Sequence, residues 1–393
     1  MAIREVKLGK VATVKGGKRL PKGINLITKP NPHPYIRVRD LNGKKTLELD
    51  GSFEFVDDET QKAISRYIVT GGDIVLSIVG TIGLVSVVGD SLNEANLTEN
   101  CVKLTSLSGI DRDYLYYYLK SSYGQQEIAR GTVGAVQAKL PIKNIQDISI
   151  PLPDEVTQRK IADILSSLDA KIEVNQRIND NLQQQAFSVF DNLIANAENN
   201  DCTVSDYAFL NPKRTLTKNQ VARSIDMSQL STSGAFPSGW EMKPFNGGMR
   251  FTNGDTLLAR ITPCLENGKT AFIDFLDDGE VAFGSTEYIV LAPKNDTPPE
   301  MLYCLARYPA FVDYAVKNMN GSSGRQRVSA ETVGQYRLPL FDKHSLVLFK
   351  EVVSPMFLKM RYNSLENIRL SELRDALLPK LMSGEIDVSA VQL

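Results

Sequence analysis

The second half of this sequence repeats the plan of the first half, and this repeat limits the possible folds more than any other feature. The halves match at an interval close to 188 residues, as between Ile150 and Leu338. The matching segments are 72–76 (GDIVL) with 254–258 (GDTLL), Thr98-Glu99 with Thr286-Glu287, 114–116 with 301–303, 131–134 with 321–324, and 150–154 (IPLPD) with 338–342 (LPLFD). Because the halves share a plan but little identity, the sequence predicts two copies of one domain fold with different surfaces.

After each of the proline-containing segments 150–154 and 338–342, apolar residues recur at the spacing of a helix. Seam residues recur at alternating intervals of four and three, as in a coiled coil. The first seam is Ile161, Leu165, Leu168, Ile172, Asn175, Asn179, Leu182, Ala186, Val189 and Leu193, and residues 349–381 repeat it. Asp154 and Asp342 stand where an N-cap carboxylate accepts free backbone amides. The sequence predicts two long helices, the second broken or kinked at Pro355 and ending at Gly384.

The connectivity predicts that the two helices pack antiparallel. The first helix delivers the chain to the second domain, and the second helix can return alongside it. Each seam has two asparagines at its midpoint, so this packing brings Asn175 to Asn367 and Asn179 to Asn363. Buried asparagines cost stability but fix the register of a coiled coil. The alternative is that Asn175 and Asn179 face solvent on a helix that packs elsewhere.

Strand and helix patterns together predict an α+β fold. Two similar α/β domains are separated and joined by two long antiparallel coiled-coil helices, in an internal pseudo-two-fold repeat. The uncharged stretch at residues 74–89 is too short to span a membrane, and its β-branched residues and glycines favour two buried strands joined by a turn. The predicted divisions are a first domain at 1–153, a first long helix at 154–198, a second domain at 199–341, and a second long helix with the C-terminal tail at 342–393.

Composition and charge exclude several classes of function. Forty-five basic and forty-six acidic side chains give a net charge of −1, so a nucleic-acid-binding face has to be local. Two histidines and four separated cysteines argue against a metal site and a histidine-dependent triad. The cysteine usage and the charged, non-secretory start favour the cytoplasm. We therefore expect a chain that has no catalytic residues, metal site or cofactor of its own.

The first forty-five residues are strongly basic, with twelve basic side chains against two acidic ones. Glycines and prolines interrupt this run, as in loops that follow a phosphate backbone. The predicted DNA-binding residues in the run are Lys15, Lys18, Arg19, Lys22, Arg37, Arg39, Lys44 and Lys45. The alternative is a solvated basic face without a ligand.

A second DNA-binding candidate is the loop at residues 321–327 (GSSGRQR). Its small residues expose backbone amides, while Arg325 and Arg327 can reach phosphates or guanine and Gln326 can read adenine. The alternative is an ordinary surface turn. The matching loop of the first half ends in Gln137 and Lys139, and the weaker candidates of the second half are Arg250, Arg260 and Lys269.

Five segments together resemble the specificity subunit of Type I restriction-modification systems. They are residues 72–83 (GDIVLSIVGTIG), 150–182 (IPLPDEVTQRKIADILSSLDAKIEVNQRINDNL), 259–269 (ARITPCLENGK), 283–288 (FGSTEY) and 373–386 (LRDALLPKLMSGEI). The resemblance extends over the whole chain. It depends on the set of segments, because none of them is catalytic.

The resemblance implies a DNA-reading subunit that is not itself an enzyme. Each target-recognition domain would read one half of a bipartite, asymmetric site in double-stranded DNA, and the helices would set the gap. The implied partners are two modification subunits, which bind S-adenosylmethionine and methylate adenine, and restriction subunits with translocase and nuclease activity. The modification subunits would cover apolar residues outside the seam, including Ile164, Ile178, Phe187 and Phe190. No membrane partner is expected.

Two other functions fit the same architecture. An antiparallel coiled-coil adaptor would bind proteins or ligands at its globular ends without DNA. The DNA-reading subunit of a related restriction system, which cuts on both sides of its bipartite site, would differ in the enzyme subunit that it binds. DNA-dependent methylation by a reconstituted complex separates the adaptor from the DNA-reading subunit of a Type I complex.

Overall fold

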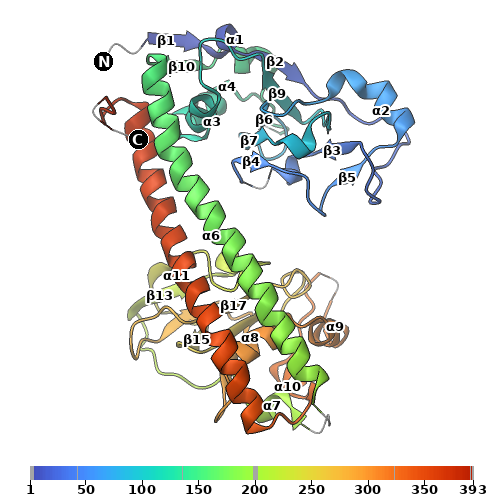
Figure 1. Ribbon diagram of the computed structural model, residues 1–393, viewed down its shortest axis with the longest axis vertical. Coiled ribbons are helices and arrows are strands. Elements are labelled where there is room, and N and C mark those ends of the chain that lie inside the picture. The colour runs from blue at the N-terminus through green and yellow to red at the C-terminus, as the bar shows by residue number, and fades with distance from the viewer. Residues whose placement is uncertain are drawn as a thin grey trace. The chain divides into compact units, whose positions relative to one another are not determined.

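The computed structural model describes residues 4–41, 43–134, 136–197, 202–322, 324–389 and 391. The chain divides into two compact units, the first containing residues 1–170 and 371–393 and the second containing residues 171–370. Each unit combines β-sheets, short helices and a part of each long helix (Figure 1). The predicted α+β class with two similar domains and two long helices is confirmed.

Two sheets form the centre of the first unit. The larger has the order β2-β9-β6-β7-β4, antiparallel except for β4 with β7. The smaller has the order β5-β3-β8, with β3 parallel to β8. The strands are β2 (Thr13–Gly16), β3 (Pro34–Ile36), β4 (Thr46–Leu47), β5 (Glu54–Phe55), β6 (Ile74–Ser77), β7 (Val85–Val88), β8 (Asn96–Leu97) and β9 (Cys101–Thr105), and β1 (Arg4–Lys7) pairs separately with β10 (Ser149–Leu152). β6 and β7 are the two buried strands predicted within residues 74–89.

The second unit also has two sheets. One has the antiparallel order β12-β19-β16-β17, and the other has the order β14-β13-β18-β15, with β13 parallel to β18. The strands are β12 (Ala208–Leu210), β13 (Val221–Ile225), β14 (Glu241–Pro244), β15 (Met249–Phe251), β16 (Thr256–Ala259), β17 (Thr270–Phe272), β18 (Ala282–Gly284) and β19 (Tyr288–Pro293), and β11 (Cys202–Thr203) pairs with β20 (Arg337–Leu338).

The strand orders show that the two units repeat one fold. The run β2-β9-β6-β7 matches β12-β19-β16-β17, and the parallel pair of β3 with β8 matches that of β13 with β18. The repeat predicted from the sequence is therefore confirmed. One residue equivalence was wrong: three residues connect β8 to β9 and also β18 to β19, so Glu287 matches Asn100 and not Glu99. The paired strands decide which residues are equivalent, and they place Thr98-Glu99 one residue out of register with Thr286-Glu287.

Each larger sheet lies between helices and the smaller sheet. On β6, Ile74 and Leu76 pack in a cluster that includes helical residues, whereas Val75 packs in a cluster with the smaller sheet. Leu258 and Leu257 on β16 divide in the same way, as expected for strand residues that alternate between faces. The short helices are α1 (Leu8–Val11), α2 (Asp58–Ile64), α3 (Arg112–Lys120), α4 (Ser122–Gly131), α5 (Ile142–Gln146), α7 (Val204–Tyr207), α8 (Pro299–Arg307), α9 (Pro309–Lys317) and α10 (Ala330–Gly334).

The long helices are α6 (Glu155–Ala195) and α11 (Lys343–Met382), green and red in Figure 1. In the second unit, the side-chain amide of Asn175 donates to the side-chain oxygen of Asn367 at 2.9 Å. Asn363 donates to Asn179 in the same way at 2.8 Å. Asn175 is buried and Asn179 is partly buried, so the alternative in which both asparagines face solvent is wrong. Both predicted pairs, and with them the antiparallel register, are confirmed.

Of the break or kink expected at Pro355, the break is wrong, because α11 continues through this residue, and the kink stays a prediction. Val353 and Phe357 on either side of the proline are buried in the core of the second unit. Their packing offsets the roughly 3 kcal/mol that a proline costs inside a helix. After the end of α11, Gly384 has a φ of +74°, the left-handed conformation predicted for this glycine.

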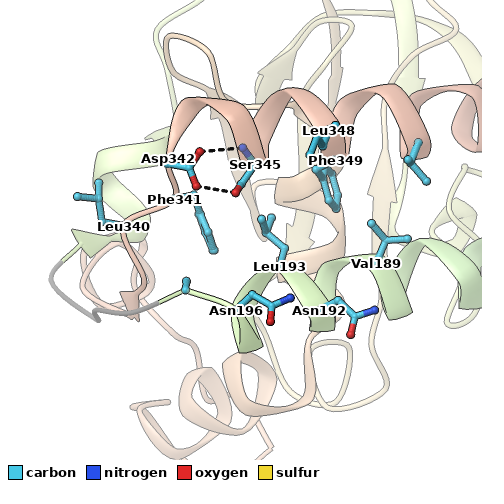
Figure 2. A pocket seen from close by; sticks show the side chains of 12 residues that line it. Val189, Asn192, Leu193, Asn196, Leu340, Phe341, Asp342, Ser345, Leu348 and Phe349 are labelled. Carbon is cyan, nitrogen blue, oxygen red and sulfur yellow. Dashed lines mark hydrogen bonds between the residues drawn. The ribbon is translucent and has the colours of Figure 1, made fainter.

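Aspartates cap both long helices, as predicted. Asp154 Oδ1 accepts a hydrogen bond from the backbone amide of Thr157 at 2.9 Å. Asp342 Oδ1 accepts one from the amide of Ser345 at 3.0 Å (Figure 2). The hydroxyl groups of Thr157 and Ser345 donate to the other carboxylate oxygens. These hydrogen bonds hold the pKa of both aspartates below the ordinary value.

Replacing Asp342 with alanine should lower the melting temperature of the second unit by about 2–4 °C, because the cap of α11 is lost. The lowered pKa gives the pH dependence its sign: the stabilisation is present above pH 3.8 and is lost as the pH falls through the pKa of the folded state. Trp240 is the only tryptophan and lies in the second unit, so its fluorescence during heating measures the change. Asp342→Asn still caps and should retain most of the stability; equal losses in the two variants would contradict the capping role.

The described residues contain no helix with both the length and the apolar character of a membrane span. All four cysteines are free thiols, and burial raises the pKa of Cys101 to about 12. Over the same residues, no cluster of three histidine, cysteine, aspartate or glutamate side chains is placed to hold a metal ion.

Candidate nucleic-acid interface

The first unit has a surface hollow of about 370 Å³. Three of the predicted DNA-binding residues, Arg19, Arg37 and Arg39, line it. The other lining residues are Leu20, Leu26, Tyr35, Val38, Thr98, Glu99 and Asn100. The side chains of Arg19 and Arg39 are 81% and 59% exposed, so the hollow presents two accessible cations.

A carboxylate holds Arg19 at the rim of this hollow. Arg19 Nε donates to Glu99 at 2.7 Å, and Glu99 belongs to the connection between β8 and β9. Burial alone raises the pKa of Glu99, but hydrogen bonds from Arg19, its own backbone amide and Thr98 outweigh burial and leave the pKa below its ordinary value. Glu99 therefore stays ionised at neutral pH and keeps Arg19 in place.

Arg37 and Arg39 share two carboxylates, those of Asp40 and Glu54. Arg37 is 3.4 Å from Asp40 and also pairs with Glu54. Arg39 lies 3.6 Å from Asp40 and 3.4 Å from Glu54. Only 19% of the Arg37 side chain is exposed, so we assign Arg37 a structural role and keep Arg39 as the accessible cation of the pair.

The lysines predicted to bind DNA separate into two groups. Those that lie exposed on the surface are Lys15, Lys18, Lys22 and Lys44. Lys45 differs, because only 18% of its side chain is exposed. Its ammonium donates to Asp113 at 2.9 Å and to Ser166 at 2.7 Å, on α3 and α6. The interpretation of Lys45 as a DNA contact is therefore corrected: it connects elements inside the first unit.

Both units carry a loop at the same point of the repeat, as predicted. In the first unit, the backbones of Val133 and Lys139 exchange two hydrogen bonds of 2.9 Å. In the second unit, the backbones of Asn320 and Arg327 exchange two hydrogen bonds of 2.9 Å. Lys139 also bridges to Val79, after β6, and Arg327 bridges to residue 261, after β16. Lys139 and Arg327 are therefore equivalent residues at the return of the two loops.

The other loop candidates differ in exposure. Gln137 and Arg325 are exposed, whereas Gln326 is partly buried. The backbone carbonyl of Gln326 accepts a hydrogen bond from the amide of Thr262 at 3.0 Å, which ties this part of the loop to the segment after β16.

Arg327 forms an ion pair with Glu287, in the connection between β18 and β19. Arg327 Nε donates to the two carboxylate oxygens of Glu287 at 3.0 and 2.9 Å, and Nη2 donates to Oε1 at 2.7 Å. The pKa of Glu287 is lowered, first by these hydrogen bonds and further by the charges of Arg327 and Arg260. The second unit thus places two arginines around one ionised carboxylate.

The three weaker candidates occupy different environments. Lys269 Nζ donates to the carbonyl oxygen of Met227 at 2.7 Å, which favours a structural role. The guanidinium of Arg250 lies 5.7 Å from the ring centre of Phe245. Arg260 is partly buried, and its backbone amide donates to the carbonyl oxygen of Glu287 at 3.0 Å. Of the three, only Arg260 is next to the predicted loop arginines.

Sequence reasoning missed the two carboxylates, Glu99 and Glu287, that hold predicted arginines. Arg19 and Glu99 are eighty residues apart in the chain, and Glu287 and Arg327 are forty apart. No local pattern pairs residues at such distances. The available signal was that each acid lies in the same short connection of the repeat, between β8 and β9 or between β18 and β19, although the two acids are one position apart in it.

Known proteins similar to this chain share one description. Residues 3–184 match the family model of the Type I restriction modification DNA specificity domain. The HindI specificity subunit of Haemophilus influenzae is 24% identical over 331 residues, which cover 63% of this chain and 71% of that protein. The MjaIX specificity subunit of Methanocaldococcus jannaschii is 21% identical, with coverage of 90% and 87%.

A solved structure is similar in fold over almost the whole chain. The S subunit of a Type I restriction-modification system from M. genitalium has a TM-score of 0.55 and 18% sequence identity. The match covers 97% of this chain and 96% of that one. The repeated domain, the paired long helices and the matched family model agree with one another. Residues 3–184 therefore match a Type I restriction modification DNA specificity domain, and the chain is similar to specificity subunits of Type I restriction enzymes.

Proposed function

We propose that this chain is the non-catalytic DNA-reading subunit of a Type I restriction-modification complex, in which each unit reads one half of a bipartite, asymmetric target. The observation that carries the proposal is that one strand order recurs with different side chains at equivalent surface positions. Lys139 in the first unit corresponds to Arg327 in the second, and Asn100 corresponds to Glu287. Two similar folds with different recognition residues suit two different half-sites.

The accessible cations give each unit a way to bind DNA. In the first unit, Arg19 and Arg39 border a hollow near exposed lysines, and such a cluster can neutralise phosphates. In the second unit, Arg325 and Arg327 lie on a loop that follows a run of small residues. Because the chain is neutral overall, these clusters are local attractive surfaces.

The proposal assigns the chemistry to partner subunits. Two modification subunits would bind S-adenosylmethionine and methylate adenine, and restriction subunits would translocate and cut DNA. One surface that suits a partner is a groove of about 570 Å³ in the second unit, between the end of α6 and the start of α11 (Figure 2). Its lining includes Leu340, Leu348 and Val352, of which the first is 62% exposed and the others 47%. Because these apolar side chains are exposed, the groove suits an apolar segment of a modification subunit that would cover them.

The residues expected to contact modification subunits need one correction. Ile178 is 37% exposed, in agreement with a role in docking. Phe190 is 1% exposed and packs in the core of the second unit, against Tyr308 and Phe349. Phe190 therefore stabilises this chain and does not contact a partner.

The proposed function is tested by mapping methylated adenines on DNA after incubation with the chain, its modification subunits and S-adenosylmethionine. We expect a single bipartite motif with two different halves. Arg19→Ala with Arg39→Ala should weaken DNA binding and lower the slope of log affinity against log salt by up to about 2, because each phosphate contact contributes about 0.9.

The control is Lys10→Ala with Lys62→Ala, which removes two exposed lysines outside the hollow and should leave the salt slope unchanged. Methylation without a bipartite motif, or no DNA-dependent methylation in a fully assembled complex, would overturn the proposed function. The second result would instead favour a coiled-coil adaptor.

A further inference from the structure

We propose that Glu287 is a positioning residue, which holds Arg327 so that this arginine reads a guanine in the half-site of the second unit. The inference rests on the proposed function, and it specifies one residue that positions an arginine and the base that this arginine reads. Three observations carry it. Hydrogen bonds hold the backbone of Arg327, some of its side-chain N–H groups have no partner within the described chain, and its side chain is accessible to a ligand.

The backbone of Arg327 is fixed on both sides. Its amide donates to Asn320 and its carbonyl accepts from the amide of Asn320, both at 2.9 Å. The next residue, Val328, is buried and donates to the carbonyl oxygen of Arg260 at 3.0 Å. The arginine thus projects from a backbone that is tied to the segment directly after β16, and not from a free loop tip.

Glu287 occupies one edge of the guanidinium group. Nε and Nη2 of Arg327 donate to this carboxylate, and Nη1 donates to the carbonyl oxygen of Arg325 at 3.1 Å. An arginine has five N–H groups. Over the described residues, the contacts account for three of them and leave one on each terminal nitrogen for a ligand. Guanine presents two acceptors, O6 and N7, in the major groove, and arginine binds both at once.

Accessibility and charge fit this arrangement. The side chain of Arg327 is 38% exposed and that of Glu287 is 26% exposed, so a ligand reaches the arginine while the carboxylate stays partly covered. Arg260 lies beside the same carboxylate, and its charge contributes to the low pKa of Glu287. A carboxylate between two arginines leaves a net positive site, which remains attractive to DNA. The equivalent residues of the first unit, Asn100 and Lys139, lack this pairing of carboxylate with guanidinium, so the two units are expected to read different bases.

The test measures base preference with the assembled methyltransferase complex. The half-site read by the second unit is randomised in a DNA library, the other half-site is kept constant, and methylation of each sequence is counted. Arg327→Ala should reduce the preference for guanine at one position by about 5- to 150-fold. Glu287→Gln keeps the size of the side chain and should reduce the same preference by about 2- to 5-fold, as expected for a partly exposed pair.

A double variant separates positioning from a general structural role. If Glu287 acts through Arg327, Glu287→Gln has no further effect on base preference when Arg327 is already alanine. The preferences in the other half-site stay unchanged in all three variants, which controls for folding and assembly. Glu99→Gln is the control in the first unit: Glu99 holds Arg19, which is assigned to phosphates, so this variant should leave the guanine preference of the second half-site unchanged.

The outcomes are distinguishable. A wild-type complex that shows no base preference in either half-site overturns the proposed function and this inference together. A wild-type complex with a clear preference that Arg327→Ala and Glu287→Gln leave unchanged overturns the inference alone. A uniform loss of affinity over all sequences also overturns it, because Arg327 would then contact a phosphate.

Discussion

A chain that lacks residues 173–179 and 363–369 should direct methylation to a target whose gap is shorter by about three base pairs, with both half-sites unchanged. Removing one heptad from each helix shortens the pair by ~10 Å at 1.5 Å per residue, and ~3.4 Å of DNA corresponds to one base pair. The two deletions keep the antiparallel register, because they remove the asparagines that pair with each other. Methylation mapping measures the gap.

The structure supports the choice of these segments. Among the described residues, the hydrophobic clusters of the two units include no residue of 173–179 or 363–369. The deletion also turns the helix ends by ~20°, which is expected to lower the rate of methylation. Deleting the heptad from one helix alone is the control, and it should abolish methylation because the seam loses its register. An unchanged gap after the double deletion would show that the helices do not set the spacing.

Asp169→Ala should reduce the free energy of unfolding of the first unit by about 2–4 kcal/mol. Asp169 accepts hydrogen bonds from Arg374 Nη1 at 2.7 Å and from the hydroxyl of Tyr117 at 2.6 Å. Only 15% of the aspartate side chain and 19% of the arginine side chain are exposed, so the variant leaves a largely buried charge without this partner. Burial and Asp169 together raise the pKa of Tyr117, which therefore remains a hydrogen-bond donor.

Native-state hydrogen exchange of first-unit amides measures this change, since Trp240 reports on the second unit. Leucine at both Asp169 and Arg374 should recover part of the loss, because the arginine charge is no longer left buried, whereas the buried Tyr117 hydroxyl still lacks its acceptor. Arg159→Ala, which breaks an exposed pair with Glu155 in the same unit, serves as the control and should change stability by less than about 0.5 kcal/mol. A loss in the double-leucine variant equal to that of Asp169→Ala would contradict the explanation.

Several features of the fold were predictable because their signals are local or periodic. The caps at Asp154 and Asp342 depend on residues three positions along the helix. The seam repeats every seven residues, and its two asparagines mark the midpoint, so connectivity alone predicted the pairs of Asn175 with Asn367 and Asn179 with Asn363. Such patterns need no knowledge of tertiary contacts.

The site was less predictable, because charge alone does not show which cations are free. Arg19, Arg37, Arg39 and Lys45 belong to one basic run, yet only Arg19 and Arg39 are accessible cations of the hollow. Arg37 and Lys45 have mostly buried side chains, with ion pairs to acids elsewhere in the first unit. A long-range ion pair forms only after strands and helices have brought distant residues together.

The sequence by itself determined the internal repeat, the two long helices, their capping residues and their antiparallel register, because periodic apolar spacing and short-range hydrogen bonds encode them. Only the tertiary structure decided that α11 passes through Pro355, that Glu287 matches Asn100, and that Glu287 holds Arg327. The physical reason is that packing energy, strand register and ion pairing each depend on residues far apart in the chain, and these meet only when the sheets and helices are assembled.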